Sequence, residues 1–148
     1  MKAVLQRVSS TVLKIDGEIY SEISYGLCVY LGFAPTDTKA EVDYIIDRIG
    51  KIRIFEDENG KMNLDLKAVN GEVILIPNFT LYADTSSRRP SFCAAMNPSE
   101  AKVLYDYACE QFDQKFFKAK RGVFGADMEI NSTSIGPINI VLERSAKC

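Results

Sequence analysis

The chain has 148 residues, of which 47% are hydrophobic and 26% charged, and its length and composition fit a single globular domain. It contains no histidine, which excludes Ser-His-Asp and Cys-His hydrolytic mechanisms. The formal net charge of −2 and a pI near 5.2 argue against a general nucleic-acid binder but leave room for a local basic patch.

The first third of the chain predicts β-strands. Residues 2–15 are mostly apolar or alternating, with Gln6 and Arg7 interrupting the apolar positions. Residues 18–23 form a second short strand, and residues 27–33 are a continuous apolar run. Such a run, bounded by glycine, is typical of a strand buried on both faces.

The hydrophobic period changes after residue 37, which predicts a helix. Thr38 followed by Glu41 forms a capping-box start, and Gly50 suits the helix end. One helical face carries Val42, Ile45, Ile46 and Ile49. Residues 51–55 alternate again and predict a further strand before the charged turn at residues 56–61.

The middle of the chain predicts a buried strand and a second helix. Residues 71–84 read as a strand interrupted at Pro77, where a bulge or a strand exit is expected because proline cannot donate to the ladder. A helix begins at Asn97, with Pro98 in its first position and Glu100 in its first turn. Its buried stripe is predicted to be Leu104, Ala108, Phe112 and Phe116.

Two strands, at residues 123–130 and 136–144, are predicted to end the chain. The order of strands, helix, strands, helix and strands gives an α+β fold, with residues 1–148 as a single domain. We expect mostly antiparallel and mixed β-sheets, with the two main helices packed on one side.

Membrane, metal and secretory functions are not indicated. No run of about 18 apolar residues is present, and Arg7 interrupts the region that a signal peptide would need. The cysteines have no CxxC spacing, and no histidine completes a zinc site; they are Cys28, Cys93, Cys109 and Cys148. We therefore expect a cytoplasmic protein with reduced thiols, no metal and no cofactor.

Thr80 is the first candidate for chemistry. A threonine in a strand is most often only a good β-former. Pro77, however, is expected to break the ladder just before it, so that the backbone N–H groups of Phe79 and Thr80 could face a ligand. Amides placed in this way are the components of an oxyanion hole.

Gly136-Pro137 is the second candidate, although a Gly-Pro pair in a loop is most often a turn. An X-Pro bond can be cis, and the sequence does not give the isomer. Nearby carboxylates such as Asp84, Asp127 and Glu129 have no spacing that identifies an acid–base pair, so they are read as solvated groups.

The basic residues are the third candidate. They are Arg88, Arg89, Lys115, Lys118, Lys120 and Arg121. The last four stand at a predicted helix end, where cations complement the helix dipole, and this structural role is sufficient by itself. A second possibility is that all six contact phosphates.

Several segments, taken together, resemble the D-aminoacyl-tRNA deacylases over essentially the whole chain. In chain order they read LQRVSSTV, GLCVYLGF, KIRIFEDENGKMNLDL, NFTLYADTSSRRPSF, LYDYACEQF and GVFGADMEI. The resemblance implies a homodimer that hydrolyses the ester between a D-amino acid, or glycine, and the terminal adenosine of tRNA. It also implies that neither metal nor histidine takes part, in agreement with the composition.

The resemblance assigns roles to particular residues. The backbone amides of Phe79 and Thr80 would meet the scissile carbonyl. The Thr80 hydroxyl is a candidate nucleophile, and the alternative is attack assisted by the adenosine 2′-hydroxyl. Gly136 and Pro137, as a cis pair, would reach into the partner's pocket at the subunit interface and exclude L-amino acids.

The sequence departs from the family pattern beside the expected pocket. Pro77 and Asn78 stand where the family usually has serine and glutamine, and Ile135 and Asn139 replace an aspartate and a threonine around Gly136-Pro137. The arginine segment is also one residue shorter than usual. We favour a deacylase with altered substrate preference, with Pro77, Asn78 and Ile135 as further substrate-binding residues. The alternative is a diverged protein that binds tRNA or another nucleic acid with little or no turnover.

Overall fold

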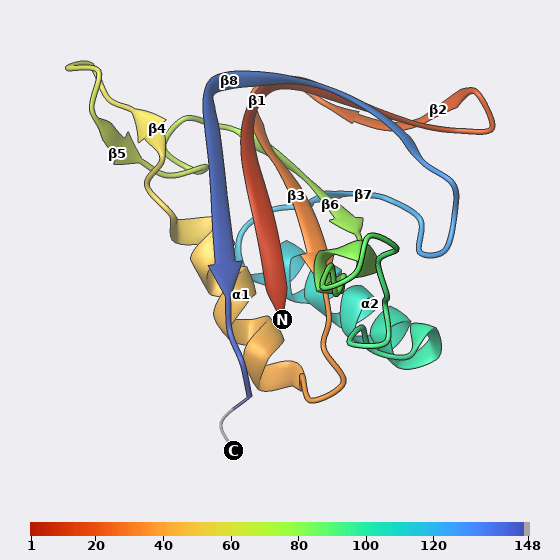
Figure 1. The fold of residues 1–148 in the computed structure, drawn as a ribbon. Coiled ribbons are helices and arrows are strands. Elements are labelled where there is room, and N and C mark those ends of the chain that lie inside the picture. The colour runs from red at the N-terminus through yellow and green to blue at the C-terminus, as the bar shows by residue number, and fades with distance from the viewer. Residues whose placement is uncertain (147–148) are drawn as a thin grey trace.

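In the computed structural model, which describes residues 1–146, two helices lie on one side of a six-stranded sheet (Figure 1). The elements are β1 (Lys2–Ile15), β2 (Glu18–Ile23), β3 (Gly26–Gly32), α1 (Lys39–Lys51), β4 (Phe55–Glu56), β5 (Met62–Leu64), β6 (Glu72–Pro77), the 3-10 helix η1 (Phe79–Tyr82), α2 (Pro98–Lys115), β7 (Lys120–Arg121) and β8 (Glu129–Glu143). Strands β4 and β5 form a separate two-stranded sheet. The predicted α+β class and the placement of both helices on one side are confirmed.

Strands β3 and β6 form the buried centre of the sheet. They pair in parallel from Gly26 opposite Glu72 to Leu31 opposite Pro77, and nearly all of their side chains are buried. Parallel strands covered on both faces have continuous apolar sequences, as these do. Gly26 allows the close approach of the two strands, because a Cβ atom there would lie 1.8 Å from the Glu72 carbonyl oxygen.

Helix α1 begins with the predicted capping box and buries the predicted face. The Thr38 N–H donates to Glu41 Oε2 at 2.8 Å, and Ala40 N–H donates to Thr38 Oγ1 at 3.2 Å. The predicted strand at residues 51–55 is wrong for most of its length. The helix continues to Lys51, an irregular connection follows, and pairing begins only at Phe55. The apolar residues Ile52 and Ile54 alternate with charged ones because both pack against the core, without forming a ladder.

Helix α2 also begins where the sequence predicts. The Asn97 side chain accepts from Ser99 N–H at 3.0 Å, and Pro98 occupies the first turn. Ala108 and Phe112 are fully buried, and the helix is tied to the central strand by Tyr105, whose hydroxyl donates to the Leu75 carbonyl oxygen at 2.8 Å. The Tyr105 hydrogen bond therefore joins α2 to β6 two residues before Pro77.

The two predicted C-terminal strands are replaced by a loop and one long strand. Residues 123–128 lie in turns and irregular backbone, with Gly125 at a φ of +79°, and only β8 is a strand. Strand β8 pairs antiparallel with β1, but its register shifts between Ser134, opposite Val8, and Asn139, opposite Gln6. The intervening residues 135–138 therefore form a bulge opposite Arg7, and the chain does not reverse there.

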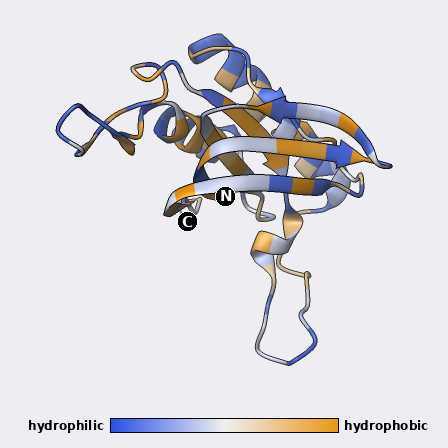
Figure 2. Cartoon of the chain, turned by 90° about the horizontal axis from the view of Figure 1, so that it is seen from above, coloured by the Kyte–Doolittle hydropathy of each residue, from blue (hydrophilic) through white to orange (hydrophobic). Residues whose placement is uncertain are grey.

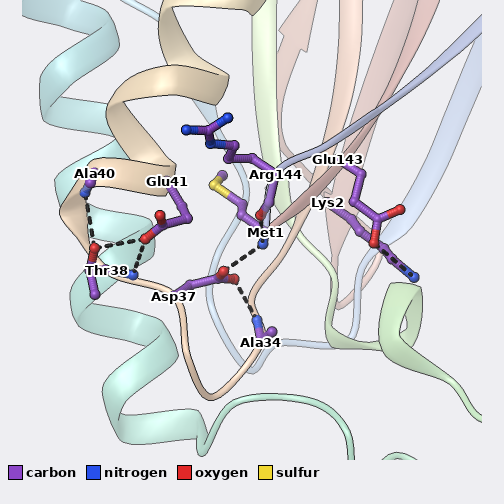
Figure 3. Close-up of polar contacts among 9 residues, drawn as sticks. All are labelled: Met1, Lys2, Ala34, Asp37, Thr38, Ala40, Glu41, Glu143 and Arg144. Carbon is purple, nitrogen blue, oxygen red and sulfur yellow. Dashed lines mark hydrogen bonds and ion pairs between the residues drawn. The ribbon is translucent and has the colours of Figure 1, made fainter. Parts of the chain in front are cut away.

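A buried ion pair fixes the start of β1 (Figure 3). The Met1 ammonium donates to Asp37 Oδ1 at 2.6 Å and to the Arg144 carbonyl oxygen at 2.7 Å, and neither side chain of the ion pair is exposed. Asp37 Oδ2 also accepts from Ala34 N–H at 2.6 Å. The Asp37 carboxylate thus joins β1, the end of β8 and the loop before α1.

Among the cysteines, Cys28 and Cys109 are buried and Cys93 is exposed, all as free thiols; Cys148 lies outside the described residues. None of the helices formed by residues 1–146 is long and apolar enough to cross a membrane.

Candidate active site

The candidate site begins where β6 ends. Asn78 N–H donates to the Leu31 carbonyl oxygen at 2.7 Å, one residue beyond the last β3–β6 pair, and the chain then enters η1. This confirms the strand exit predicted at Pro77. Thr80 and Phe79 therefore lie in a 3-10 turn at the carboxyl end of a parallel strand pair, an edge at which α/β proteins often place ligands.

Asn78 caps the 3-10 helix and holds Thr80. Its Oδ1 atom accepts both the Thr80 N–H, at 3.1 Å, and the Thr80 hydroxyl. The Thr80 amide therefore faces the Asn78 side chain rather than an open space. The Phe79 N–H lies one position earlier, at the first residue of the turn, where no carbonyl of the turn itself can accept from it.

Two cavities meet at Phe79, whose side chain is 56% exposed. One has a volume of about 370 Å³ and is almost wholly apolar, with Phe33, Met96 and Phe124 in its walls. The other, of about 340 Å³, contains Asn78 and Asp127 together with apolar residues. The Phe79 ring packs edge-on against Phe92, with centroids 5.2 Å apart. Phe79 thus separates an apolar space from a partly polar one.

Gly136 and Pro137 lie in the bulge of β8 and are exposed, while Ile135 is half-buried. The peptide bond between Gly136 and Pro137 is cis, as the family resemblance implies. Gly136 has a φ of +116°, and a Cβ atom there would lie 2.8 Å from Ile138 Cγ1, so glycine suits this position. None of residues 135–137 lines either cavity beside Phe79 within the described part of the chain.

The two arginines lie between Asp84 and Ser91, in the segment that follows η1 and that projects from the body of the molecule (Figure 2). Asp84 and Ser91 close the loop through paired backbone hydrogen bonds of 2.8 and 2.9 Å. Ser86 N–H donates to the Asp84 carboxylate, which lowers the pKa of that group. Arg88 and Arg89 are both exposed, on the segment that directly follows η1.

The other predicted basic residues lie elsewhere. Lys120 and Arg121 pair with Ile74 and Leu75, in β6 upstream of Pro77. Arg121 is engaged by Asp113 at 2.9 Å, whereas Lys115 and Lys118 are exposed. The six basic residues therefore form two separate groups, and only the arginine pair is next to the Phe79 turn in the chain.

The sequence interpretation missed several residues of this region. Phe92 and Phe124 line the apolar cavity, although the second was expected to lie in a strand. Arg7 is buried opposite the bulge, where its Nη1 donates to the Ile54 carbonyl oxygen at 2.9 Å. A charged residue in the middle of an apolar strand was the available signal, since arginine is rarely buried without such a partner. In residues 1–146 no cluster of three His, Cys, Asp or Glu side chains is arranged to hold a metal ion.

These features define an α+β protein whose pocket opens at the end of a parallel strand pair. Residues 4–143 match the family model described as D-Tyr-tRNA(Tyr) deacylase, and the chain belongs to this family. The D-aminoacyl-tRNA deacylase of Desulfatibacillum aliphaticivorans is 44% identical over 144 residues, covering 97% of this chain and 99% of the relative. That of Syntrophomonas wolfei is 42% identical and covers 97% of each.

Two solved structures are similar to this chain in fold. The c-Myc DNA Unwinding Element Binding Protein is 34% identical, with a TM-score of 0.94 over 99% of this chain and 100% of the other. A structure described as a probable eukaryotic D-amino acid tRNA deacylase is 15% identical, with a TM-score of 0.82 over 95% of this chain and 97% of the other, and it shares the fold.

Proposed function

We propose that the protein hydrolyses the ester bond of D-aminoacyl-tRNA and releases the free amino acid and tRNA. The observation that carries the proposal is the Phe79–Thr80 turn at the end of β6, with a cavity on each side, in a chain of the D-Tyr-tRNA(Tyr) deacylase family. Glycyl-tRNA, which has no side chain to exclude, is a second candidate substrate. An activity on tRNA is in keeping with the cytoplasmic location expected from the sequence.

The chemistry relies on backbone groups and on the substrate itself. Water attacks the ester carbonyl, the bond to the ribose oxygen breaks, and the released proton goes to that oxygen. The Phe79 N–H is the donor for the oxyanion that forms. The Thr80 hydroxyl donates to an amide oxygen, which is far too weak a base to activate it, so the substrate's 2′-hydroxyl is assigned the assisting role.

The two cavities take different parts of the substrate. The apolar space beside Phe92 suits the terminal adenine, which every aminoacyl-tRNA carries. The aminoacyl group then lies on the side of Asn78 and Pro77. Arg88 and Arg89, on the neighbouring loop, contact tRNA phosphates, and this part of the affinity falls steeply with added salt.

We assign the chiral filter to a second copy of the chain. Gly136 and Pro137 do not line the cavities of their own chain, and Phe79 and Phe92 are exposed at 56% and 38% in a single copy. A homodimer that inserts the β8 bulge of one protomer beside Phe79 of its partner covers these rings. Such an interface, with Ile135 flanking the pair, leaves no room for the side chain of an L-amino acid.

The test is the rate of ester loss from matched D-Tyr-, L-Tyr- and Gly-tRNA, with Thr80→Ala and Phe79→Ala measured beside the unaltered protein. We expect rapid loss of the D-tyrosyl and glycyl esters, with the L-ester spared. Thr80→Ala should retain activity within about tenfold, because its hydroxyl is not the nucleophile. Complete loss of activity in Thr80→Ala, in a folded protein, would return that role to the hydroxyl.

A second candidate is nucleic-acid binding without turnover. Two observations favour it: the Thr80 amide is occupied by Asn78, and a 34% identical structure belongs to a protein named for DNA binding. It predicts that D-Tyr-tRNA is retained in a filter-binding assay while its ester decays no faster than in buffer. Ester loss at catalytic protein concentrations would eliminate this candidate.

A further inference from the structure

A third cavity, of about 640 Å³, lies at the opposite end of β6 from Phe79. Three connections meet there: the turn between β2 and β3, the loop at residues 66–71 that precedes β6, and the chain at residues 116–120 that follows α2. No residue that lines it also lines either cavity beside Phe79. It is therefore a separate site on the same strand.

The walls of this cavity include three aromatic side chains. Tyr25 is 38% exposed and is held edge-on by the buried Phe55, with ring centroids 5.4 Å apart. Phe116 and Phe117 both pack against Phe112, with centroids 5.0 and 5.3 Å from it. Because each ring is fixed by a core partner, little side-chain entropy is lost when a flat ligand packs on them.

The rim of the cavity is positively charged. Lys67, Lys118 and Lys120 are exposed, and none of them forms an ion pair within the part of the chain that the structure describes. The one carboxylate in the lining, Glu72, already accepts from Ser24 N–H at 2.6 Å. The lining thus contains three cations and one anion, so its local charge is positive although the net charge of the whole chain is −2.

We propose that this cavity binds a nucleotide of the tRNA substrate upstream of its 3′ end, with the base on the aromatic side chains and the phosphate at the lysines. Stacking platforms combined with lysines are the usual means of holding single-stranded or unpaired nucleotides. The inference rests on the proposed function and extends it with a second contact to the same substrate.

The spacing of the two sites fits one RNA strand. Strand β6 runs over six residues from Glu72 to Pro77, which corresponds to about 17 Å at the usual rise per residue. A stacked nucleic-acid strand advances about 3.4 Å per nucleotide, so this length corresponds to about five nucleotides. With the terminal adenosine at Phe79, the cavity falls near the junction of the single-stranded end and the acceptor stem.

The test compares Lys67→Glu/Lys118→Glu with the control Lys61→Glu/Lys102→Glu, which changes the net charge equally on surfaces outside the cavity. Each protein is assayed for hydrolysis of D-Tyr-tRNA and of D-tyrosyl-adenosine, which carries the terminal nucleoside alone. Binding of an RNA hairpin that ends in CCA and carries no amino acid is measured at several salt concentrations.

We expect the cavity variant to raise the KM for D-Tyr-tRNA and the Kd for the hairpin by about tenfold, with kcat unchanged and a salt slope lower by about 1 to 2. Hydrolysis of D-tyrosyl-adenosine should match the control. Equal hairpin affinity in the two variants would overturn the inference. So would a loss of D-tyrosyl-adenosine hydrolysis in the cavity variant as large as its loss on D-Tyr-tRNA. Binding of an oligoglutamate peptide as tightly as the hairpin would overturn it as well, since the cavity would then accept any polyanion.

The hairpin assay also separates this inference from the proposed function. If the unaltered protein hydrolyses neither ester, the deacylase proposal fails. Loss of hairpin binding in the cavity variant alone would still support an RNA site at Tyr25, Lys67 and Lys118.

Discussion

The buried pair β3–β6 and the exposed segment at residues 78–97 adjoin at Asn78, yet different interactions hold them. Strand β3 is almost wholly buried and hydrogen-bonded in a continuous ladder. The segment that follows is kept in shape by side chains that accept from nearby backbone N–H groups, those of Asn78, Asp84 and Asn97. The comparison teaches that stability is concentrated in the buried core and chemistry in the exposed segment at residues 78–97, so mutations should separate the two.

The largest effect on stability is expected from Phe112→Ala. Phe112 lies on α2 and is fully buried in the hydrophobic core, and removing such a ring costs about 4 kcal/mol of the free energy of unfolding. Urea denaturation followed by circular dichroism measures it. The matched change in the exposed segment, Phe79→Ala, should cost less than about 1 kcal/mol because that ring is 56% exposed. Similar losses in the two variants would refute the division.

Asp37→Asn is expected to come next, at about 3 kcal/mol. Asparagine can still accept from Ala34 N–H, but the Met1 ammonium is left buried without its counter-charge. The control is Lys2→Ala, which breaks the partly exposed Lys2–Glu143 pair at 4.0 Å (Figure 3). That pair should contribute less than about 1 kcal/mol. Thermal unfolding at constant pH would show whether the buried pair is in fact the more important of the two.

Asn78→Ala should reverse the pattern, with a small effect on stability and a larger one on activity. Loss of an N-cap costs about 1 kcal/mol, here confined to a single 3-10 turn. Thr80 is released at the same time, and we expect kcat for D-Tyr-tRNA to fall about tenfold. Thr38→Ala, which removes the cap of α1, should cost similar stability with kcat unchanged. If the two variants lose kcat equally, Asn78 has no special role at the site.

The smallest perturbation is chemical labelling of the thiols. Cys93 lies in the exposed segment and should react with a maleimide in the native protein, whereas the buried Cys28 and Cys109 should react only after unfolding. Burial raises the pKa of Cys109 to about 11, so its thiol stays protonated and unreactive at pH 8. Peptide mass mapping identifies the labelled residue, and rapid native labelling of Cys109 would contradict the buried assignment.

The same pKa shift gives the direction of a pH dependence. The pKa of Cys109 is higher in the folded protein than in the unfolded chain. Its contribution to the free energy of unfolding is therefore complete below the unfolded pKa of about 8.5 and is lost as the pH rises toward about 11. Stability should therefore decline over this alkaline range, and less so in Cys109→Ala.

Local signals were enough to predict both helix starts and the strand exit. The Thr38–Glu41 capping box, Asn97-Pro98 and Pro77 act within a few residues, so their effect is visible in the sequence. The class of fold followed from their order. The cis pair at Gly136 was implied by the family resemblance alone, since neither isomer has a distinct local pattern.

What could not be predicted depends on distant contacts. Val123 and Phe124 have the composition of a strand, but Phe124 packs beside Tyr105 and lines the apolar cavity, so no ladder forms. The β8 bulge is set by its register against β1, with Arg7 opposite. Likewise, the sequence indicates only that Asn78 replaces the family's longer glutamine at the pocket. The fold shows that Asn78 caps a turn and holds Thr80.

The pairing of β1 with β8 has a consequence for synthesis of the protein. Lys2 lies opposite Glu143, so β1 finds this partner only after all the elements from β2 to β7 have been translated. At about 5 to 20 residues per second, the edge of β1 that faces β8 stays unpaired for roughly 7 to 28 seconds. Contacts so distant in sequence slow folding, and open strand edges promote aggregation. Chaperone dependence during expression should therefore end once β8 has been synthesised and has paired with β1.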